Sequence, residues 1–154
     1  MIHGRFMLLV SNWDTKKSNL AIFEDGSADE PRYLYADVDW GASLGAWGNL
    51  FSWSKWDCKG FEKQSPKFVK GVENGELSWG FKGKNRKDMT TNISQHDVRW
   101  ILQYLGRITD EQIRTGLAAS GASPQQTECY TRALRQRIGQ LQQAAKAAAP
   151  QTTN

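Results

Sequence analysis

Two short polar segments contain the residue types and spacing that phosphate chemistry requires. Asp14, Lys16 and Asn19 form a compact polar loop (residues 14–19), and Asp39 and Gly41 follow after two short apolar stretches. In phosphoryl transfer, one carboxylate orients the attacking hydroxyl and takes its proton. A second carboxylate and an amide oxygen hold Mg²⁺ against the phosphates. These five residues supply such a set of groups.

The segment between the polar loop and Asp39 predicts a β-hairpin. Leu20–Phe23 is typical of a strand and is followed by the turn sequence Glu24–Gly26. Pro31 opens a second apolar stretch at Tyr33–Tyr35, which leads to Asp39. Because an antiparallel return brings the chain back to its starting point, we expect the polar loop and Asp39 to lie at the same end of the hairpin.

The two segments resemble the catalytic motifs of one large enzyme superfamily. The spacing of Asp14, Lys16 and Asn19 resembles the Asp-x-Lys-x-x-Asn catalytic loop of the protein-kinase superfamily. Asp39 and Gly41 resemble its metal-binding Asp-Phe-Gly segment, and the intervening strands match the pair that links those motifs in kinases.

The resemblance extends beyond the motifs. Through the flanking segments 9–19 and 35–45, and through 97–100, the chain looks like a bacterial, uncharacterised group of atypical kinase-like proteins (HipA/lipid-kinase-like). It implies an α+β fold: the C-terminal lobe of a kinase-like domain over residues 1–149, with two β-hairpins followed by a three-helix group. Residues 150–154 are expected to form a disordered tail.

The resemblance also implies roles and cofactors. Asp14 would orient the acceptor hydroxyl as a base, and Lys16 would neutralise charge on the transferring group. Asn19 and Asp39 would bind Mg²⁺ bridging the phosphates of ATP, and Gly41 would let the backbone turn sharply after the metal ligand. The partner is then a nucleotide, and the function an ATP-dependent phosphotransferase.

The chain departs from the family pattern at several positions. Asn12 and Trp13 stand where the family usually has His-Arg, and Trp40 replaces the usual Phe. Asp37 is an alternative metal ligand. Asp39 is favoured over it, because Gly41 follows Asp39 two residues later, as in the family segment.

The chain also contains no Gly-rich loop and no strand lysine paired with a helix glutamate. Those groups belong to the N-terminal lobe of a kinase. We therefore expect a C-lobe fragment with little or no kinase activity alone. Three origins fit this expectation: a truncated gene product, a fragment of a longer protein, or a lobe that pairs with a separate N-lobe chain. A degenerate, purely structural lobe is a further alternative.

A different class of function competes with this one: a non-enzymatic binding module for nucleic acid or a protein. A basic, Gly- and Ser-rich loop contains tryptophans that would stack on bases: Trp40, Trp47, Trp53 and Trp56. Burial of these side chains as a local core is the favoured interpretation, and nucleic acid is the less favoured partner. A second basic cluster is expected to be a solvated surface: Lys82, Lys84, Arg86 and Lys87.

Bulk properties exclude a few classes. The net charge is +4 and the pI about 9.1, which suits an anionic partner such as a nucleotide. No apolar run reaches the roughly 20 residues of a membrane span, and Phe6–Val10 is too short for a signal-peptide core. The compartment is left unassigned, with the cytoplasm as the default. Cys58 and Cys129 fit no zinc spacing, and two thiols are favoured over a disulfide.

The rest of the chain predicts ordinary scaffold elements. Segment 41–56 is expected to be an ordered loop and 55–70 a basic connection, and Asn74-Gly75 predicts a tight hairpin turn. Three helices are expected, each starting at a capping box: Ser94 with Asp97, Thr109 with Gln112, and Ser123 with Gln126. Their predicted core residues are Val98, Ile101, Leu102, Leu105, Ile113, Leu117, Tyr130, Leu134, Ile138 and Leu141.

Overall fold

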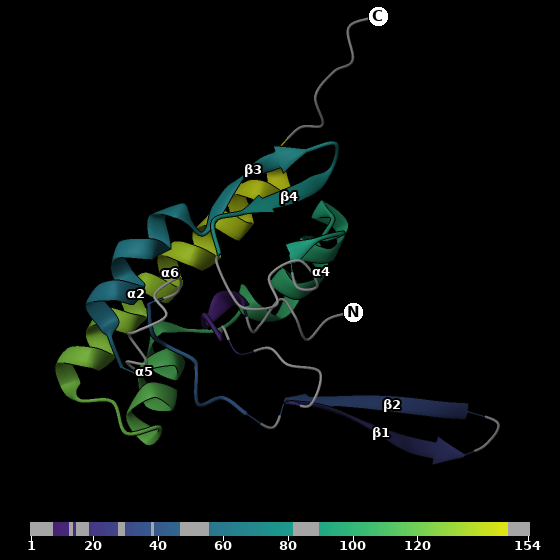
Figure 1. Ribbon diagram of the computed structural model, residues 1–154, viewed down its shortest axis with the longest axis horizontal. Coiled ribbons are helices and arrows are strands. Elements are labelled where there is room, and N and C mark those ends of the chain that lie inside the picture. Colours follow the sequence, from purple (N-terminus) through teal and green to yellow (C-terminus); the bar gives the residue numbers. More distant parts are fainter. Residues whose placement is uncertain are drawn as a thin grey trace, which may run out of the picture.

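The chain folds as a mixed α+β protein. A computed structural model describes residues 8–12, 14, 19–27, 30–37, 39–46, 56–81 and 90–147. In this part of the chain there are two β-hairpins and four helices: α2 (Cys58–Gln64), α4 (Gln95–Leu105), α5 (Asp110–Ala119) and α6 (Pro124–Lys146). The helices and the second hairpin form one body, from which the first hairpin projects (Figure 1).

Helix α6 is the centre of the body. Helices α2, α4 and α5 and strand β3 (Val69–Glu73) all pack against it. Its predicted core stripe is confirmed, because Tyr130, Leu134, Ile138 and Leu141 are all buried. These positions recur at helical spacing, so one face of α6 buries while the other meets solvent.

The three predicted helix starts are confirmed in detail. Ser94, Thr109 and Ser123 each accept a hydrogen bond from the backbone of the third helical residue, whose side chain bonds back to the cap. Helix α5 ends just before Gly121, which has φ +92°, a value that favours glycine. Helix α6 ends at Lys146, with Ala147 as its C-cap.

The hairpin predicted at Asn74-Gly75 is also confirmed. Strands β3 and β4 (Glu76–Trp79) pair antiparallel, and Asn74 and Gly75 have φ values of +52° and +78°. Positive φ at both central positions is the geometry of a type I′ turn. The carbonyl of Gly75 accepts a hydrogen bond from Gln95 N at 2.9 Å, which attaches this hairpin to the start of α4.

The first hairpin is longer than predicted. Strands β1 (Leu20–Ser27) and β2 (Glu30–Asp37) pair antiparallel from Leu20↔Asp37 to Ser27↔Glu30. The turn predicted at Glu24–Gly26 is wrong, because these residues continue β1. A turn at these residues would remove the backbone hydrogen bonds between β1 and β2 at the end of the hairpin far from the helices. Strand pairing also brings Asp25 within 3.2 Å of Arg32, with which it forms a salt bridge.

The predicted connection at residues 55–70 is wrong as well, because it contains α2 and a 3₁₀ turn (Ser65–Lys67). Asp57 caps α2 by accepting from Gly60 N at 3.0 Å, and Phe61 is fully buried. Lys59 and Lys63 are exposed on this short helix, whereas Lys67 belongs to the 3₁₀ turn and Lys70 to β3.

A disulfide joins α2 to α6. Cys58 and Cys129 are bonded, with their Cα atoms 6.2 Å apart. The prediction of two free thiols is therefore wrong. The unpredicted helix α2 explains the error, since it is this helix that places Cys58 against α6.

Several predictions lie outside the described residues: Lys16, Trp47, Trp53, the basic cluster at 82–87 and the tail at 150–154. Of the other loop tryptophans, Trp56 packs edge-on against Tyr130 at 5.7 Å and Trp40 is 40% exposed. No helix in the described part of the chain combines the length and apolar character needed to cross a membrane.

Candidate functional site

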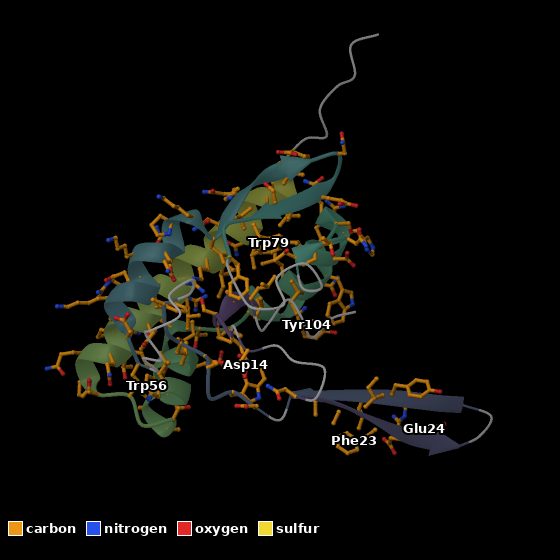
Figure 2. The ribbon with its side chains drawn as sticks, viewed as in Figure 1. Asp14, Phe23, Glu24, Trp56, Trp79 and Tyr104 are labelled. Atoms are coloured by element: carbon orange, nitrogen blue, oxygen red, sulfur yellow. A yellow bond between two sulfur atoms is a disulfide. The ribbon has the colours of Figure 1, made fainter. Side chains whose placement is uncertain are left out.

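The polar loop is closed by a hydrogen bond between its two ends. Asn19 Nδ2 donates to the main-chain oxygen of Asp14 at 2.9 Å. Asn19 is buried and Asp14 is half-buried, at the point where the first hairpin joins the helical body (Figure 2). This hydrogen bond fixes the orientation of the Asn19 carboxamide.

Asp39 lies just beyond the end of β2 and is exposed. Its Oδ1 accepts a hydrogen bond from Gly41 N at 2.9 Å, so the carboxylate is held by its own turn. A Cβ on Gly41 would lie 3.0 Å from that oxygen. A larger residue here would therefore require the carboxylate to shift, whereas the sharp turn expected from the sequence does not use a left-handed φ.

The side chain of Asn12 links the two acidic segments. Asn12, fully buried and two residues before Asp14, donates from Nδ2 to the main-chain oxygen of Asp39 at 3.0 Å. The β1–β2 register adds to this link, since Leu20 pairs with Asp37 at the same end of the hairpin. The structure thus brings together the segments that carry Asp14, Asn19, Asp39 and Gly41.

Hydrogen bonds attach both acidic segments to each other and to the helical body. Leu44 N donates to Val10 O at 2.8 Å, so the chain after Asp39 pairs with the chain before the polar loop. The buried Tyr130 hydroxyl of α6 donates to Leu44 O at 2.6 Å. Burial, and secondarily the charge of Asp57, raises the pKa of Tyr130 well above its usual value, so this hydroxyl remains a donor.

Arg137 of α6 anchors the segment before the polar loop. Its Nη1 donates to Leu9 O at 2.8 Å and to Ser11 Oγ at 2.6 Å, and its Nε donates to Ser65 Oγ at 2.9 Å. The guanidinium lies 3.6 Å from the ring centroid of Phe61. The side chain is completely buried, and this desolvation lowers the pKa of Arg137 well below its usual value.

Sequence reasoning missed the positioning roles of Asn12 and Arg137. Arg137 stands three residues after Leu134 and therefore on the core stripe of α6, a spacing visible in the sequence. Nothing local to Asn12 predicts its hydrogen bond, because its acceptor is 27 residues away.

The donor set suits a hard cation only in part. Two carboxylates and a carboxamide supply oxygen atoms, which Mg²⁺ prefers. The described residues contain no group of three or more His, Cys, Asp or Glu side chains placed to hold a metal ion. A metal held by Asp14, Asn19 and Asp39 would therefore need further oxygen ligands from outside the described residues, such as phosphates and water.

Comparisons with other proteins identify no relative. No protein-family model, no curated protein and no solved structure matches the chain.

Proposed function

We propose that the rim formed by Asp14, Asn19 and Asp39 binds the phosphates of a nucleotide through Mg²⁺, as part of a kinase-like phosphotransferase site. The observation that carries the proposal is the 3.0 Å hydrogen bond from Asn12 to Asp39, which holds the two acidic segments together. The Leu20↔Asp37 pairing and the Leu44 N to Val10 O hydrogen bond support the same arrangement. Two polar turns that lay apart would be a common and uninformative feature.

Each residue has a chemical task in this proposal. Asn19 and Asp39 offer the oxygens that hold the metal, and nucleotide phosphates and water complete its coordination. Asp14 orients the acceptor hydroxyl, and Lys16 balances charge on the transferring group. Gly41 allows the backbone to approach the Asp39 carboxylate.

Binding of Mg-ATP, measured by calorimetry, tests the proposal without depending on turnover. Asp39→Asn keeps the shape and the oxygen that accepts from Gly41 but removes the charge. We expect it to weaken binding at least about tenfold, since even changes behind a metal ligand have effects of this size. Chelation of Mg²⁺ should weaken binding by the wild-type chain similarly.

Asp25→Asn is the matched control. It makes the same change in charge on the same hairpin, at an exposed carboxylate paired with Arg32 away from the rim. Equal Mg-ATP affinity of the Asp39→Asn and Asp25→Asn variants would contradict the proposal, as would affinity unaffected by chelation.

The competing binding-module hypothesis remains a prediction. Packing of Trp56 against Tyr130 supports the structural interpretation for that tryptophan. In the same experiment, binding of single-stranded nucleic acid with a steep salt dependence, together with no response to Mg-ATP, would favour the module.

A further inference from the structure

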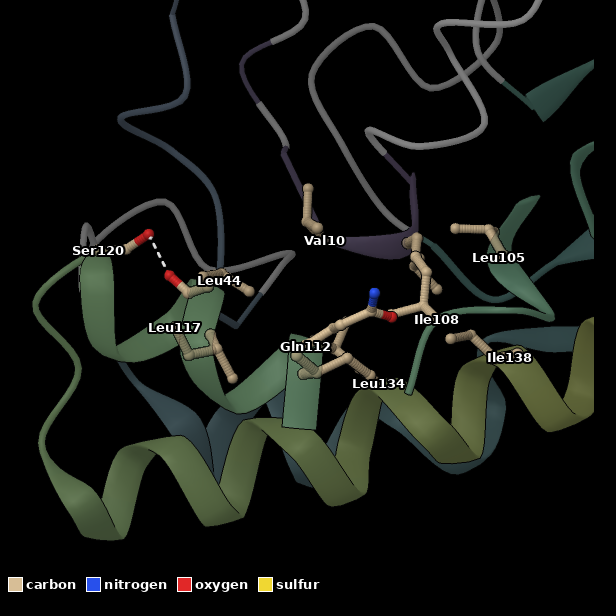
Figure 3. A pocket seen from close by; sticks show the side chains of 12 residues that line it. Val10, Leu44, Leu105, Ile108, Gln112, Leu117, Ser120, Leu134 and Ile138 are labelled. Carbon is tan, nitrogen blue, oxygen red and sulfur yellow. Dashed lines mark hydrogen bonds between the residues drawn. The ribbon is translucent and has the colours of Figure 1, made fainter. Parts of the chain in front are cut away.

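A pocket lies beside the candidate site, between α5, α6 and the two segments that carry the acidic residues (Figure 3). Its volume is about 330 Å³. Its lining comes from five parts of the chain: the segment before the polar loop, the segment after Asp39, the end of α4 with the turn that follows it, α5, and α6.

The lining is apolar except at one edge. Gln112 and Ser120 are its polar members, and together with Gly116 they form a stripe along the exposed side of α5. Ser120 Oγ donates to Gly116 O at 2.8 Å, and Gln112 Oε1 accepts from Thr109 N at 2.9 Å. The amide nitrogen of Gln112 is turned towards the pocket (Figure 3).

Gly116 keeps this edge of the pocket open. It lies inside α5, where glycine is disfavoured relative to alanine, and its φ is not in the left-handed region. A Cβ placed on it would meet nothing within 4 Å. Neither packing nor backbone conformation requires glycine here, but a larger side chain would occupy the mouth of the pocket.

We infer that this pocket binds a small, mainly apolar molecule that carries one hydrogen-bond acceptor. The volume is about twice that of the roughly 150 Å³ cavity that holds benzene, so the bulk of two fused rings fits. It also falls within the range of ligand sites, which are mostly apolar with few polar groups. The acceptor would pair with the amide nitrogen of Gln112. This inference does not depend on the proposed function.

Two near-isosteric probes test both parts of the inference: 2-acetylnaphthalene, which has a carbonyl acceptor, and 2-ethylnaphthalene, which lacks it. Ligand-observed NMR titrations on the full chain should show binding of both, with the acetyl compound tighter by about threefold, the worth of one neutral hydrogen bond. In Gln112→Met this ratio should fall to one. A ratio that is unchanged in the variant would overturn the role of Gln112.

Gly116→Leu should fill the mouth and weaken both probes at least tenfold. Gly139→Leu is the matched control, because Gly139 is also a helix glycine with nothing within 4 Å of a Cβ but does not line the pocket. Its affinities should equal those of the wild type. Equal loss in both variants, or none in Gly116→Leu, would overturn the site.

One measurement is independent of any variant. Intermolecular NOEs should connect the acetyl probe to the methyl groups of Ile113 and Leu117, which face the pocket. NOEs confined to other methyl groups, or no binding up to the solubility limit of the probe, would refute the inference.

Discussion

Replacement of Arg137 by methionine should destabilise the protein substantially. Methionine retains much of the apolar stem but removes the guanidinium. The change deletes the hydrogen bonds to Leu9 O (2.8 Å), Ser11 Oγ (2.6 Å) and Ser65 Oγ (2.9 Å). It also removes the cation that lies over the ring of Phe61.

Two opposing effects set the size of the loss. Hydrogen bonds from a charged donor contribute about 1.5–3 kcal/mol each, which favours the wild type. Burial of a cation costs several kcal/mol, which the methionine variant avoids. The two serine hydroxyls can adapt, since Ser65 Oγ already donates to Phe61 O at 2.8 Å, but the carbonyl of Leu9 cannot turn. We therefore expect a net loss of about 2–4 kcal/mol in the free energy of unfolding.

Urea unfolding at neutral pH measures this loss. Arg132→Met is the matched control, because it makes the same chemical change on the same helix. Arg132 pairs with Glu62 at 3.1 Å, but both side chains are accessible to solvent, so we expect a loss of no more than about 1 kcal/mol. If the two variants were equally stable, Arg137 would not anchor the segment before the polar loop.

Three further predictions concern the disulfide, the Tyr130 hydroxyl and the Arg114–Glu128 ion pair. Replacing Cys58 and Cys129 by alanine should lower the free energy of unfolding by about 4 kcal/mol, because the bridge closes a separation of 71 residues. Reducing agent should destabilise the wild type by the same amount in urea unfolding, and equal stability with and without it would mean unpaired thiols. Tyr130→Phe removes a 2.6 Å hydrogen bond to a backbone carbonyl and should cost about 1–3 kcal/mol, measured in the same way. The hydrogen bond from Arg114 lowers the pKa of Glu128, so Arg114→Gln should raise it in an NMR titration. The stabilising contribution of that pair is present above the ordinary carboxyl pKa and is lost as the pH falls through the lowered value. A Glu128 titration unchanged by the substitution would contradict this.

The elements predicted correctly are those fixed by local chemistry. A capping box at Ser94, Thr109 or Ser123 satisfies backbone groups within the same turn, and Asn74-Gly75 supplies the two positive φ values of its own turn. Such determinants lie within four residues of one another, so they are visible in a single sequence.

The elements predicted wrongly depend on distant contacts. Helix α2 is short, and its sequence has no helical spacing of apolar residues that would predict it. Its buried residues are Cys58 and Phe61, and both are stabilised across the fold: Cys58 by the disulfide to Cys129 and Phe61 by packing against Tyr130 at 5.3 Å. The turn at Glu24–Gly26 failed for a similar reason, since pairing with β2 overrides a sequence that favours a turn locally.

The candidate site shows the same division. The polar loop and the end of the hairpin follow from the sequence, because the antiparallel return places them together. Their attachment does not, because Asn12 reaches Asp39 across 27 residues and Arg137 reaches Leu9 across 128 residues. No local pattern in the sequence predicts either of these two side-chain contacts.

The geometry of the rim is therefore determined more by buried contacts with the helical body than by the hairpin. The hairpin exposes more than half of Ile22, Phe23, Tyr33 and Leu34, and a two-stranded sheet with so little covered surface is only marginally stable in water. By contrast, the residues that fix the acidic segments are buried: Asn12, Tyr130 and Arg137. These buried groups hold the chain segments that precede and follow the hairpin. The relative position of Asp14 and Asp39 should therefore be retained when the outer ends of β1 and β2 fray.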